Sequence, residues 1–209
     1  MNSNYETARV AVDAVIFTIH NKKLKVFLHT REKEPFQNKK ELPGGLLISN
    51  ETAEKALSRK IKEILDIDKL YFEQFFTFTE PQRDPRIRTI SIGFIALIDS
   101  QKIKDFSNWF DYKSVKEFAF DHKAIIEKAV KYLKKEINSI IAMQFIPSVF
   151  PLNMLQEVYE IIENKKYDNR NFRRKVLNEG VVIETEKIER DVSHRPAKLY
   201  KFKIDKTIS

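Results

Sequence analysis

The chain has 209 residues, of which 42% are hydrophobic and 33% charged. This composition is ordinary for a globular protein, and the length suffices for one domain of about 140 residues and a smaller second one. The absence of cysteine excludes disulfides, Cys-ligated zinc and iron–sulfur clusters. The formal net charge of +8 favours an anionic partner. No run of about 18 apolar residues and no signal-peptide pattern occurs, so we expect a cytoplasmic protein.

The N-terminal part of the chain predicts a β-hairpin followed by a helix. Residues 10–19 and 24–29 are rich in β-branched and aromatic side chains, and a break at 21–23 separates them. After the Leu-Pro-Gly-Gly segment at 42–45, apolar residues recur at helical spacing from about Glu51 to Leu65. We expect Glu51 and Glu54 in the first turn of this helix, where the helix dipole favours acids.

Two further strands and a second helix complete this part. Residues 71–79 and 88–98 are strand-like and flank a charged, turn-rich loop at 80–86, which predicts another hairpin. The stretch from Asp121 to about Asn138 has apolar residues on one side, as an amphipathic helix does. We therefore expect an α+β first domain.

A change of pattern near residue 144 indicates a second domain. Residues 145–151 carry two prolines and no charge. Beyond them the sequence predicts helices at 152–163 and 169–178, the second closed by Gly180, and short strands at 181–185 and 198–204. Helix, turn, helix and a two-stranded wing is the order of a winged helix-turn-helix. We accordingly assign residues 1–144 to the first domain and 145–209 to the second.

The helix after the double glycine carries a spaced motif. From Gly45, five residues lead to Glu51 and seven more to Arg59. This frame resembles the Nudix box, in which Gly, Glu and an Arg-Glu pair at these spacings precede two adjacent glutamates. The resemblance implies a Nudix-like α/β/α sandwich, with Glu51 and Arg59 as a scaffold ion pair. In hydrolases with the full box, the glutamates after the arginine hold magnesium ions that bridge a pyrophosphate.

Several positions depart from the Nudix pattern. Lys60 and Ile64 stand where two metal-binding glutamates are expected, and only Glu63 remains. Lys60 is one helical turn from Glu63, and a lone carboxylate beside an ammonium is a poor magnesium site. Asp66 replaces the closing glycine, so we expect the turn after the helix to be made differently. We predict that hydrolysis is lost, with no catalytic residues, no metal site and no required cofactor.

Positive charge is concentrated in the second domain. Between Lys165 and Lys175, six cations accompany one acid, Asp168, which is placed as a helix N-cap. The following residues lie where a recognition helix reaches base edges; Arg suits guanine and Asn suits adenine. The candidate DNA-binding residues are Asn169, Arg170, Asn171, Arg173, Arg174 and Lys175 on the helix and Arg190, His194, Arg195 and Lys198 on the wing. The buried side of the helix is expected to comprise Phe172, Val176 and Leu177.

Separate patches in chain order resemble one family of regulators. Residues 168–177 and 195–202 resemble the C-terminal winged helix of Nudix-related transcriptional regulators, the NrtR family. In the first domain, residues 83–86 with 90–92 and residues 119–122 resemble the same family. The resemblance implies a homodimeric repressor or activator whose Nudix domain binds a small effector. The paired winged helices would then grip a two-fold operator in double-stranded DNA.

A loop with three arginines and an aspartate suggests where the effector binds. Such a set suits anionic oxygens or hydroxyl groups. The candidate effector-binding residues are Arg31, Glu41, Glu51, Arg59, Glu63, Arg83, Asp84, Arg86 and Arg88. Members of the family are associated with ADP-ribose or with sugars such as arabinose, and the sequence does not separate the two. The structural alternative is that Asp84 and the arginines only tie down a hairpin by mutual ion pairs.

Two rival functions stay open at this stage. One is an active Nudix hydrolase of nucleoside diphosphate derivatives such as ADP-ribose, using Glu63, Glu51 and a further acid such as Glu80, with an accessory nucleic-acid-binding domain. The other is an interaction protein whose basic tail binds RNA or an acidic partner. His122 has the residue type of a general base, but its place at the start of a helix predicts capping or packing. The operator, the regulated genes and the sign of regulation also stay open.

Overall fold

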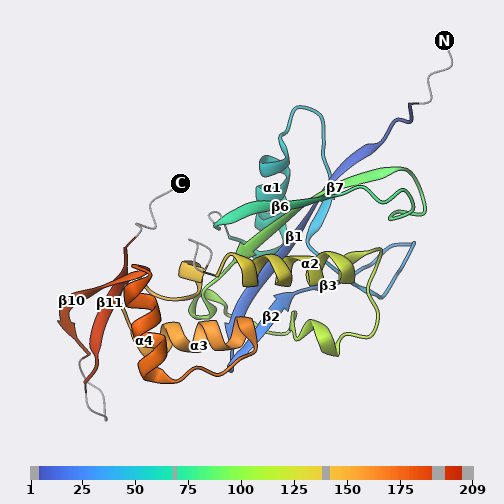
Figure 1. Ribbon diagram of the computed structural model, residues 1–209. Helices are drawn as coiled ribbons and strands as arrows, with labels where there is room; N and C mark the ends of the chain where they lie inside the picture. Colours follow the sequence, from blue (N-terminus) through green and yellow to red (C-terminus); the bar gives the residue numbers. More distant parts are fainter. Residues whose placement is uncertain (1–4, 68–69, 138–141, 190–195, 204–209) are drawn as a thin grey trace. The chain divides into compact units, whose positions relative to one another are not determined.

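The computed structural model describes residues 5–67, 70–137, 142–189 and 196–203, which form two compact units (Figure 1). The first comprises Met1–Thr18, Lys25–Ile98 and Ile103–Ala129, and the second comprises Ile19–Leu24, Asp99–Lys102 and Val130–Ser209. The helix at 122–135 contributes to both units, so the domain boundary at residue 144 stays a prediction. Among the helices within the described ranges, none combines the length and apolarity needed to cross a membrane.

A six-stranded sheet organises the first unit, in the order β6-β7-β1-β2-β8 with β5 also paired to β1. Its strands are β1 (Arg9–His20), β2 (Lys23–Phe27), β5 (Gly44–Leu46), β6 (Phe72–Phe78), β7 (Thr89–Leu97) and β8 (Trp109–Phe110). A separate small sheet pairs β3 (His29–Thr30) with β4 (Lys40–Glu41). Strand β1 is buried without interruption from Ala11 to Thr18, as expected for a central strand covered on both faces.

Both hairpins expected from the sequence are present. Strands β1 and β2 are joined through Asn21 and Lys22, whose φ angles of 49° and 57° suit the type I′ turn of a two-residue hairpin. Strands β6 and β7 pair antiparallel, with a register shift between Gln74 and Phe76. The parallel pairing of β1 with β7 has no local sequence signature, because it joins residues about as far apart as Arg9 and Thr89.

Helix α1 (Ala53–Leu65) begins two residues later than the charge pattern suggested. Thr52 is the N-cap, and its side chain accepts a hydrogen bond from the backbone N–H of Lys55 at 3.3 Å. Glu51 therefore precedes the cap instead of lying in the first turn, because a hydroxyl can satisfy the free N–H groups of the helix start. At the other end, Asp66 itself adopts the left-handed conformation, with φ 54°, that the closing glycine of the motif would favour.

Helices cover both faces of the sheet. Figure 1 shows α2 (His122–Lys135) crossing in front of the sheet and α1 behind it. From α1, Leu57 and Ile61 pack into a core cluster that includes Val12 of β1. Ile125 of α2 is fully buried. This is the α/β/α sandwich that the sequence predicted. Short 3-10 turns occur in the described part of the chain at η1 (Ser100–Lys102), η2 (Tyr112–Ser114) and η3 (Ala142–Phe145).

The second unit contains a winged helix. Its elements are β9 (Phe150–Pro151), α3 (Leu152–Glu163), α4 (Asn169–Asn178), β10 (Val182–Ile188) and β11 (Lys198–Phe202). Both helices have the bounds expected from the sequence. The wing is a three-stranded sheet instead of a two-stranded one, since the short β9 pairs with β11. Strand β9 could not be predicted, because it is two residues long and its second residue is Pro151.

Ring packing joins α4 to α3. The rings of Tyr159 and Phe172 meet edge to face with centroids 5.2 Å apart, and both side chains are buried. Val176 is also fully buried, but Leu177 is 36% exposed, so its expected place in the core was wrong. Because residues one apart on a helix face different directions, Val176 and Leu177 cannot both point at the same core.

Candidate functional site

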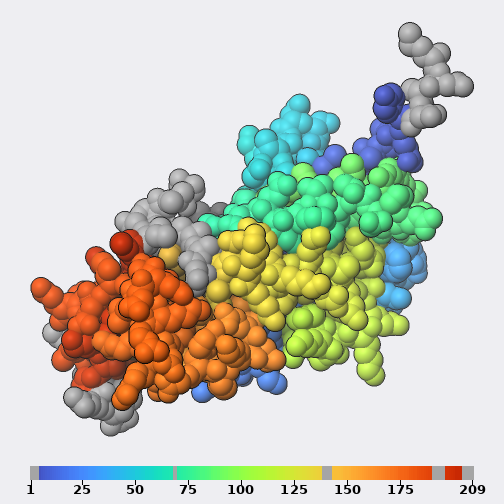
Figure 2. Space-filling view, viewed as in Figure 1, coloured from blue at the N-terminus to red at the C-terminus, as the bar shows by residue number. Residues whose placement is uncertain are grey.

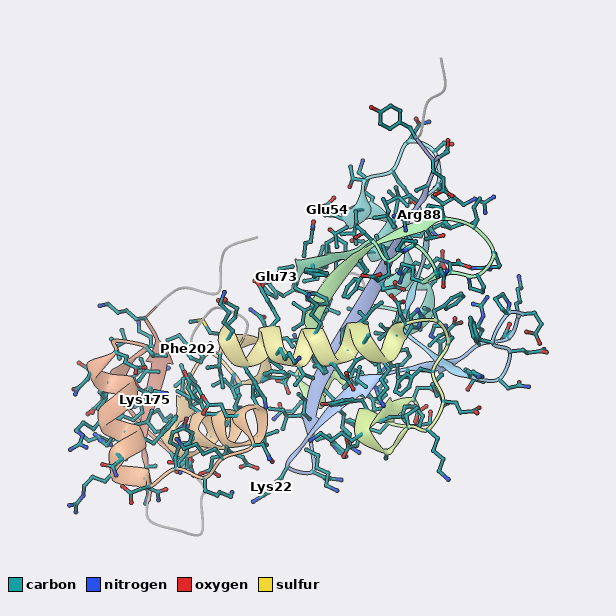
Figure 3. All side chains as sticks on the ribbon, turned by 45° about the vertical axis from the view of Figure 1, so that its right-hand side comes forward. Lys22, Glu54, Glu73, Arg88, Lys175 and Phe202 are labelled. Atoms are coloured by element: carbon teal, nitrogen blue, oxygen red, sulfur yellow. The ribbon has the colours of Figure 1, made fainter. Side chains whose placement is uncertain are left out.

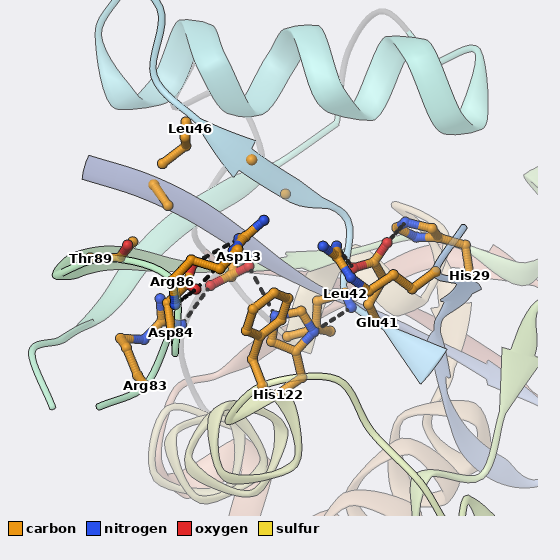
Figure 4. A pocket seen from close by; sticks show the side chains of 15 residues that line it. Asp13, His29, Glu41, Leu42, Leu46, Arg83, Asp84, Arg86, Thr89 and His122 are labelled. Carbon is orange, nitrogen blue, oxygen red and sulfur yellow. Dashed lines mark hydrogen bonds and ion pairs between the residues drawn. The ribbon is translucent and has the colours of Figure 1, made fainter. Parts of the chain in front are cut away.

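An open pocket lies in the first unit, beside β1 and β5 (Figure 4). Its lining comprises Ala11, Asp13, His29, Arg31, Glu41, Leu42, Gly44, Gly45, Leu46, Arg83, Asp84, Arg86, Thr89, Phe120 and His122. Five candidate effector-binding residues are among them, namely Arg31, Glu41, Arg83, Asp84 and Arg86. These five residues come from three separate segments of the sequence, and the fold places them around one cavity.

A buried arginine joins three segments at the base of the pocket. The Nη2 of Arg83 donates to Asp13 Oδ2 at 3.1 Å and to Asp121 Oδ1 at 2.8 Å. Ser91 Oγ also donates to Asp13 Oδ2, at 2.5 Å. Although burial opposes ionisation of Arg83, Asp13 and Asp121 raise the pKa of its guanidinium. A charge at this depth is tolerated because it is paired and hydrogen-bonded on both sides.

His122 is a pocket residue that sequence reasoning assigned to capping or packing. The backbone N–H of Leu42 donates to His122 Nδ1 at 2.9 Å, and Nε2 lies 3.5 Å from Asp13 Oδ1. Burial lowers the pKa of His122. A protonated imidazole would carry N–H on both nitrogens and would leave the Leu42 N–H without an acceptor. His122 is therefore held neutral, at the first residue of α2.

A second set of side chains frames the opposite wall. Arg31 Nη1 donates to Glu41 Oε2 at 2.8 Å, and His29 Nε2 lies 3.0 Å from Glu41 Oε1. Burial opposes ionisation of Glu41, but the hydrogen bonds from His29 and Arg31 lower its pKa. The guanidinium carbons of Arg31 and Arg86 lie 4.9 and 5.3 Å from the centre of the Phe120 ring. These cation–π contacts hold two guanidinium groups at the pocket, where they can meet a ligand that carries negative charge.

The loop after β6 combines ligand-facing and structural roles. Arg86 donates to both oxygens of Asp84, at 2.9 and 2.8 Å, and this hydrogen bonding lowers the pKa of Asp84. Arg88 does not line the pocket; its Nη1 donates to the carbonyl of Thr79 at 2.8 Å. The pair of Arg86 with Asp84 is thus the kind of mutual ion pair that the structural alternative describes, whereas Arg88 bonds a backbone carbonyl.

The remaining candidates lie along α1. Arg59 donates to Glu51 through Nη2 at 2.7 Å and Nε at 3.1 Å, which is the scaffold ion pair expected from the sequence. Glu51 Oε1 also accepts the backbone N–H of Ile48 at 2.7 Å. The Arg59 hydrogen bond, followed by the Ile48 N–H, lowers the pKa of Glu51. Glu51, Arg59 and Glu63 are absent from the pocket lining, so their part in effector binding stays a prediction.

The residues of α1 do not fit the magnesium that the Nudix pattern implies. Glu63 Oε2 lies 2.7 Å from Lys60 Nζ, and Glu63 Oε1 lies 3.4 Å from Arg59 Nη1. The single box carboxylate is thus engaged by two cations, of which Lys60 contributes most to lowering its pKa. Ile64 is half-buried against the core and offers no oxygen. Within the described ranges, no three His, Asp or Glu side chains are placed to share a metal ion.

Helix α4 presents a basic surface in the second unit. Asp168 caps it by accepting the Asn171 N–H at 2.9 Å, as predicted. In Figure 2 the side chains of α4, drawn in orange, form an exposed surface of this unit. Its exposed polar residues are Asn169, Arg170, Asn171, Arg173 and Arg174. Lys175, labelled in Figure 3, is half-buried, with its ammonium 5.4 Å from the centre of the Tyr159 ring.

In the wing, the described contacts of the candidate DNA-binding residues are ion pairs with Glu184. Arg173 Nη2 lies 3.6 Å from Glu184 Oε2 on β10, and Lys198 on β11 also pairs with Glu184. Glu184 therefore aligns cations of the helix and of the wing on one side of the unit. The candidates Arg190, His194 and Arg195 fall outside the described residues.

Comparisons with known proteins match both units. Residues 7–130 match the model of the NUDIX domain, and residues 142–202 match that of the NrtR DNA-binding winged helix domain. The chain is 30% identical over 211 residues to the ADPR responsive transcriptional repressor NtrR of Acinetobacter baylyi, covering 96% of this chain and 84% of that protein. It is also 33% identical over 128 residues to the ADP-ribose pyrophosphatase of Methanocaldococcus jannaschii, covering 59% of this chain and 73% of that enzyme.

Solved structures of a related protein also match this chain. NrtR of Shewanella oneidensis in complex with a 27mer DNA has a TM-score of 0.78 and 32% identity, and the match covers 93% of each chain. The NUDIX domain of the same protein complexed with ADP ribose has a TM-score of 0.54 and 31% identity, covering 64% of this chain and 93% of that domain.

The buried, neutral His122 predicts a specific loss of stability in mild acid. Its pKa is lowered in the fold, so the unfolded chain binds more protons and stability decreases as pH falls below the ordinary histidine pKa of about 6.5. The groups that face it are Asp13, Asp121, Glu41 and Arg83. We expect the free energy of unfolding in urea to fall by up to about 1.4 kcal/mol per pH unit on this account.

The variant His122→Gln keeps an acceptor for the Leu42 N–H and should lose most of this pH dependence between about pH 7 and 5.5. The variant His20→Gln, at the end of β1, is the control and should keep it. An unchanged slope in His122→Gln would show that another group is responsible.

Proposed function

Because the chain belongs to the NrtR family of Nudix-related regulators, we propose that it is a DNA-binding transcriptional repressor whose Nudix unit binds an ADP-ribose-like effector. The observation that carries the proposal is the match over 93% of the chain to an NrtR that binds DNA, with the Nudix and winged-helix parts in the same order. Repression follows the A. baylyi relative, which is an ADPR responsive repressor.

The proposed DNA contacts follow from the second unit. Arg170 and Asn171 lie in the first turn of α4, where a recognition helix meets base edges in the major groove. Arg173, Arg174 and Lys198 add positive charge for phosphates. We propose a cytoplasmic homodimer on a two-fold operator, since a single winged helix reads few base pairs and a pair of them doubles the recognised site.

The pocket supports ADP-ribose over an uncharged sugar as the effector. The guanidinium groups of Arg31 and Arg86, which both contact the Phe120 ring, can bind the oxygens of a diphosphate. Carboxylates such as Glu41 and Asp84 can accept hydrogen bonds from ribose hydroxyls. The ADP ribose complex of the S. oneidensis NUDIX domain supports the same choice.

We further propose that the effector is bound without being hydrolysed. The carboxylate that remains in the box, Glu63, is engaged by Lys60 and Arg59, so it is not free to bind a cation that activates a pyrophosphate. The alternative is an active hydrolase, which the likeness to the M. jannaschii pyrophosphatase favours. That likeness is confined to 59% of the chain and leaves the winged helix without a role.

A binding and turnover assay separates these two functions. With magnesium present, ADP-ribose at about one hundred times its dissociation constant should add about 2.7 kcal/mol to the free energy of unfolding, because it binds only the folded state. Chromatography of the same mixture should show intact ADP-ribose. Turnover near or above about 1 s⁻¹, an ordinary enzymatic rate, would establish the hydrolase instead.

Arg170 provides the test of DNA recognition. Arg170→Ala removes the guanidinium and should weaken binding to the upstream region of the protein's own gene by about 1–3 kcal/mol. The affinity for that region should then differ less from the affinity for random DNA. Fluorescence anisotropy at fixed salt measures both affinities. The control is Lys55→Ala, which removes one positive charge from the exposed side of α1. If the two variants bind alike, α4 is not the reading helix.

A further inference from the structure

Lys60 of α1 packs against strand β5, although Lys60 itself is not among the residues that line the pocket. A Cβ atom added to Gly45 would lie 3.0 Å from Lys60 Cε and 3.9 Å from its Nζ. Gly45 also lines the pocket. Figure 4 shows Leu46, the next lining residue of β5, on the side of that strand toward α1. The bare backbone of Gly45 thus leaves room for the lysine stem to pass over β5 beside the cavity.

The charges that line the pocket are already matched. Arg31 is paired with Glu41, and Arg86 with Asp84. Arg83 is held between two carboxylates at its buried position. The side chains of Asp13, Glu41 and Asp84 are at most 14% exposed. An anionic ligand that drew these arginines away would therefore leave a buried carboxylate without its partner, which is costly.

Lys60 can change partners more easily. Its partner Glu63 has a side chain that is 47% exposed, and Arg59 also contacts Glu63. If the ammonium of Lys60 turned toward a ligand, Glu63 would keep Arg59 and solvent as partners. A flexible stem with three donors suits this exchange better than a fixed guanidinium does.

We infer that the Lys60 ammonium binds the diphosphate group of the effector and takes the place of the divalent cation that a complete Nudix box would supply. The inference rests on the proposed ADP-ribose-like effector. Its consequence is that binding needs no metal. One fixed positive charge on the protein neutralises part of the diphosphate, but it does not generate a metal-bound nucleophile. The substitution at position 60 therefore gives recognition of the substrate of a hydrolase without hydrolysis.

The test is calorimetric titration of the full-length protein with ADP-ribose, in EDTA and in magnesium. The wild type should bind equally in both conditions. Lys60→Met keeps most of the apolar stem and removes the charge, and it should bind about tenfold or more weakly, as expected for the loss of a charge-assisted hydrogen bond. Lys62→Met is the matched control; Lys62 is on the same helix and pairs with Asp66, and this variant should bind like the wild type.

A second variant separates a contact with the ligand from a merely structural role. Lys60→Glu places a carboxylate beside Glu63, so it should bind weakly in EDTA and regain affinity when magnesium is added. Damage to the fold would not respond to magnesium in this way, and thermal unfolding of each variant checks the fold directly.

The outcomes distinguish this inference from the proposed function. If the wild type binds ADP-ribose only with magnesium, or if Lys60→Met binds as tightly as Lys62→Met, the role of Lys60 is wrong and the effector assignment stands. If the wild type does not bind ADP-ribose in either condition, the effector assignment fails and the role of Lys60 fails with it.

Discussion

The effector pocket depends on the pairing of Arg83 with two carboxylates. Its guanidinium bonds Asp13, which is 70 positions away on β1, and Asp121, which is 38 positions away before α2. Because breaking either pair would leave a buried charge uncompensated, the three segments are held in one arrangement. His122 follows Asp121 directly and meets both Asp13 and the backbone of Leu42. The base of the pocket is therefore fixed to the first turn of α2, whose last residues belong to the winged-helix unit.

The first unit combines the residues of the Nudix frame with a different charge pattern on α1. The glycines of β5 line the cavity, and the ion pair of Arg59 with Glu51 ties α1 to the segment before it. A Cβ atom on Gly44 would lie 2.3 Å from the carbonyl oxygen of Val12, so only glycine permits β5 to approach β1 so closely. Lys60 then changes the chemistry without changing this frame. The proposed separation of binding from catalysis follows because the frame is made by backbone and scaffold residues, whereas metal binding depends on a few carboxylates.

Much of this structure could be predicted from the sequence where the signal is local. The bounds of α3 and α4, the N-cap at Asp168 and the two hairpins follow from helix periodicity, capping chemistry and turn residues. The predicted start of α1 was two residues too early. Acids are favoured near a helix start in general, whereas the hydroxyl of Thr52 fixes where this helix begins. The strand β9 is too short to have a periodicity, and its pairing with β11 depends on the folded wing.

The centre of the pocket was harder to predict, because its residues are brought together by long-range pairing. Asp13 is the one charged residue in the buried stretch Ala11–Thr18 of β1, and it was the available signal of a buried polar site. Asp121 and His122 read as ordinary helix-start residues until Arg83 is placed beside them. Phe120 has a left-handed backbone, with φ 48°, and its contact with two arginines appears only in the fold. Arg88 was included by its closeness in sequence to Arg86, although it bonds Thr79 outside the pocket.

The proposed function requires that binding of the effector in the pocket change the affinity of the winged helix for DNA. The most direct measurement is the affinity of the full-length protein for the DNA upstream of its own gene, with and without saturating ADP-ribose. Coupling between the sites predicts a change of about fivefold or more, and an equal factor in the affinity for ADP-ribose when the DNA is bound, because linkage is reciprocal. Equal DNA affinity in both conditions, with ADP-ribose shown to be bound, would contradict the account.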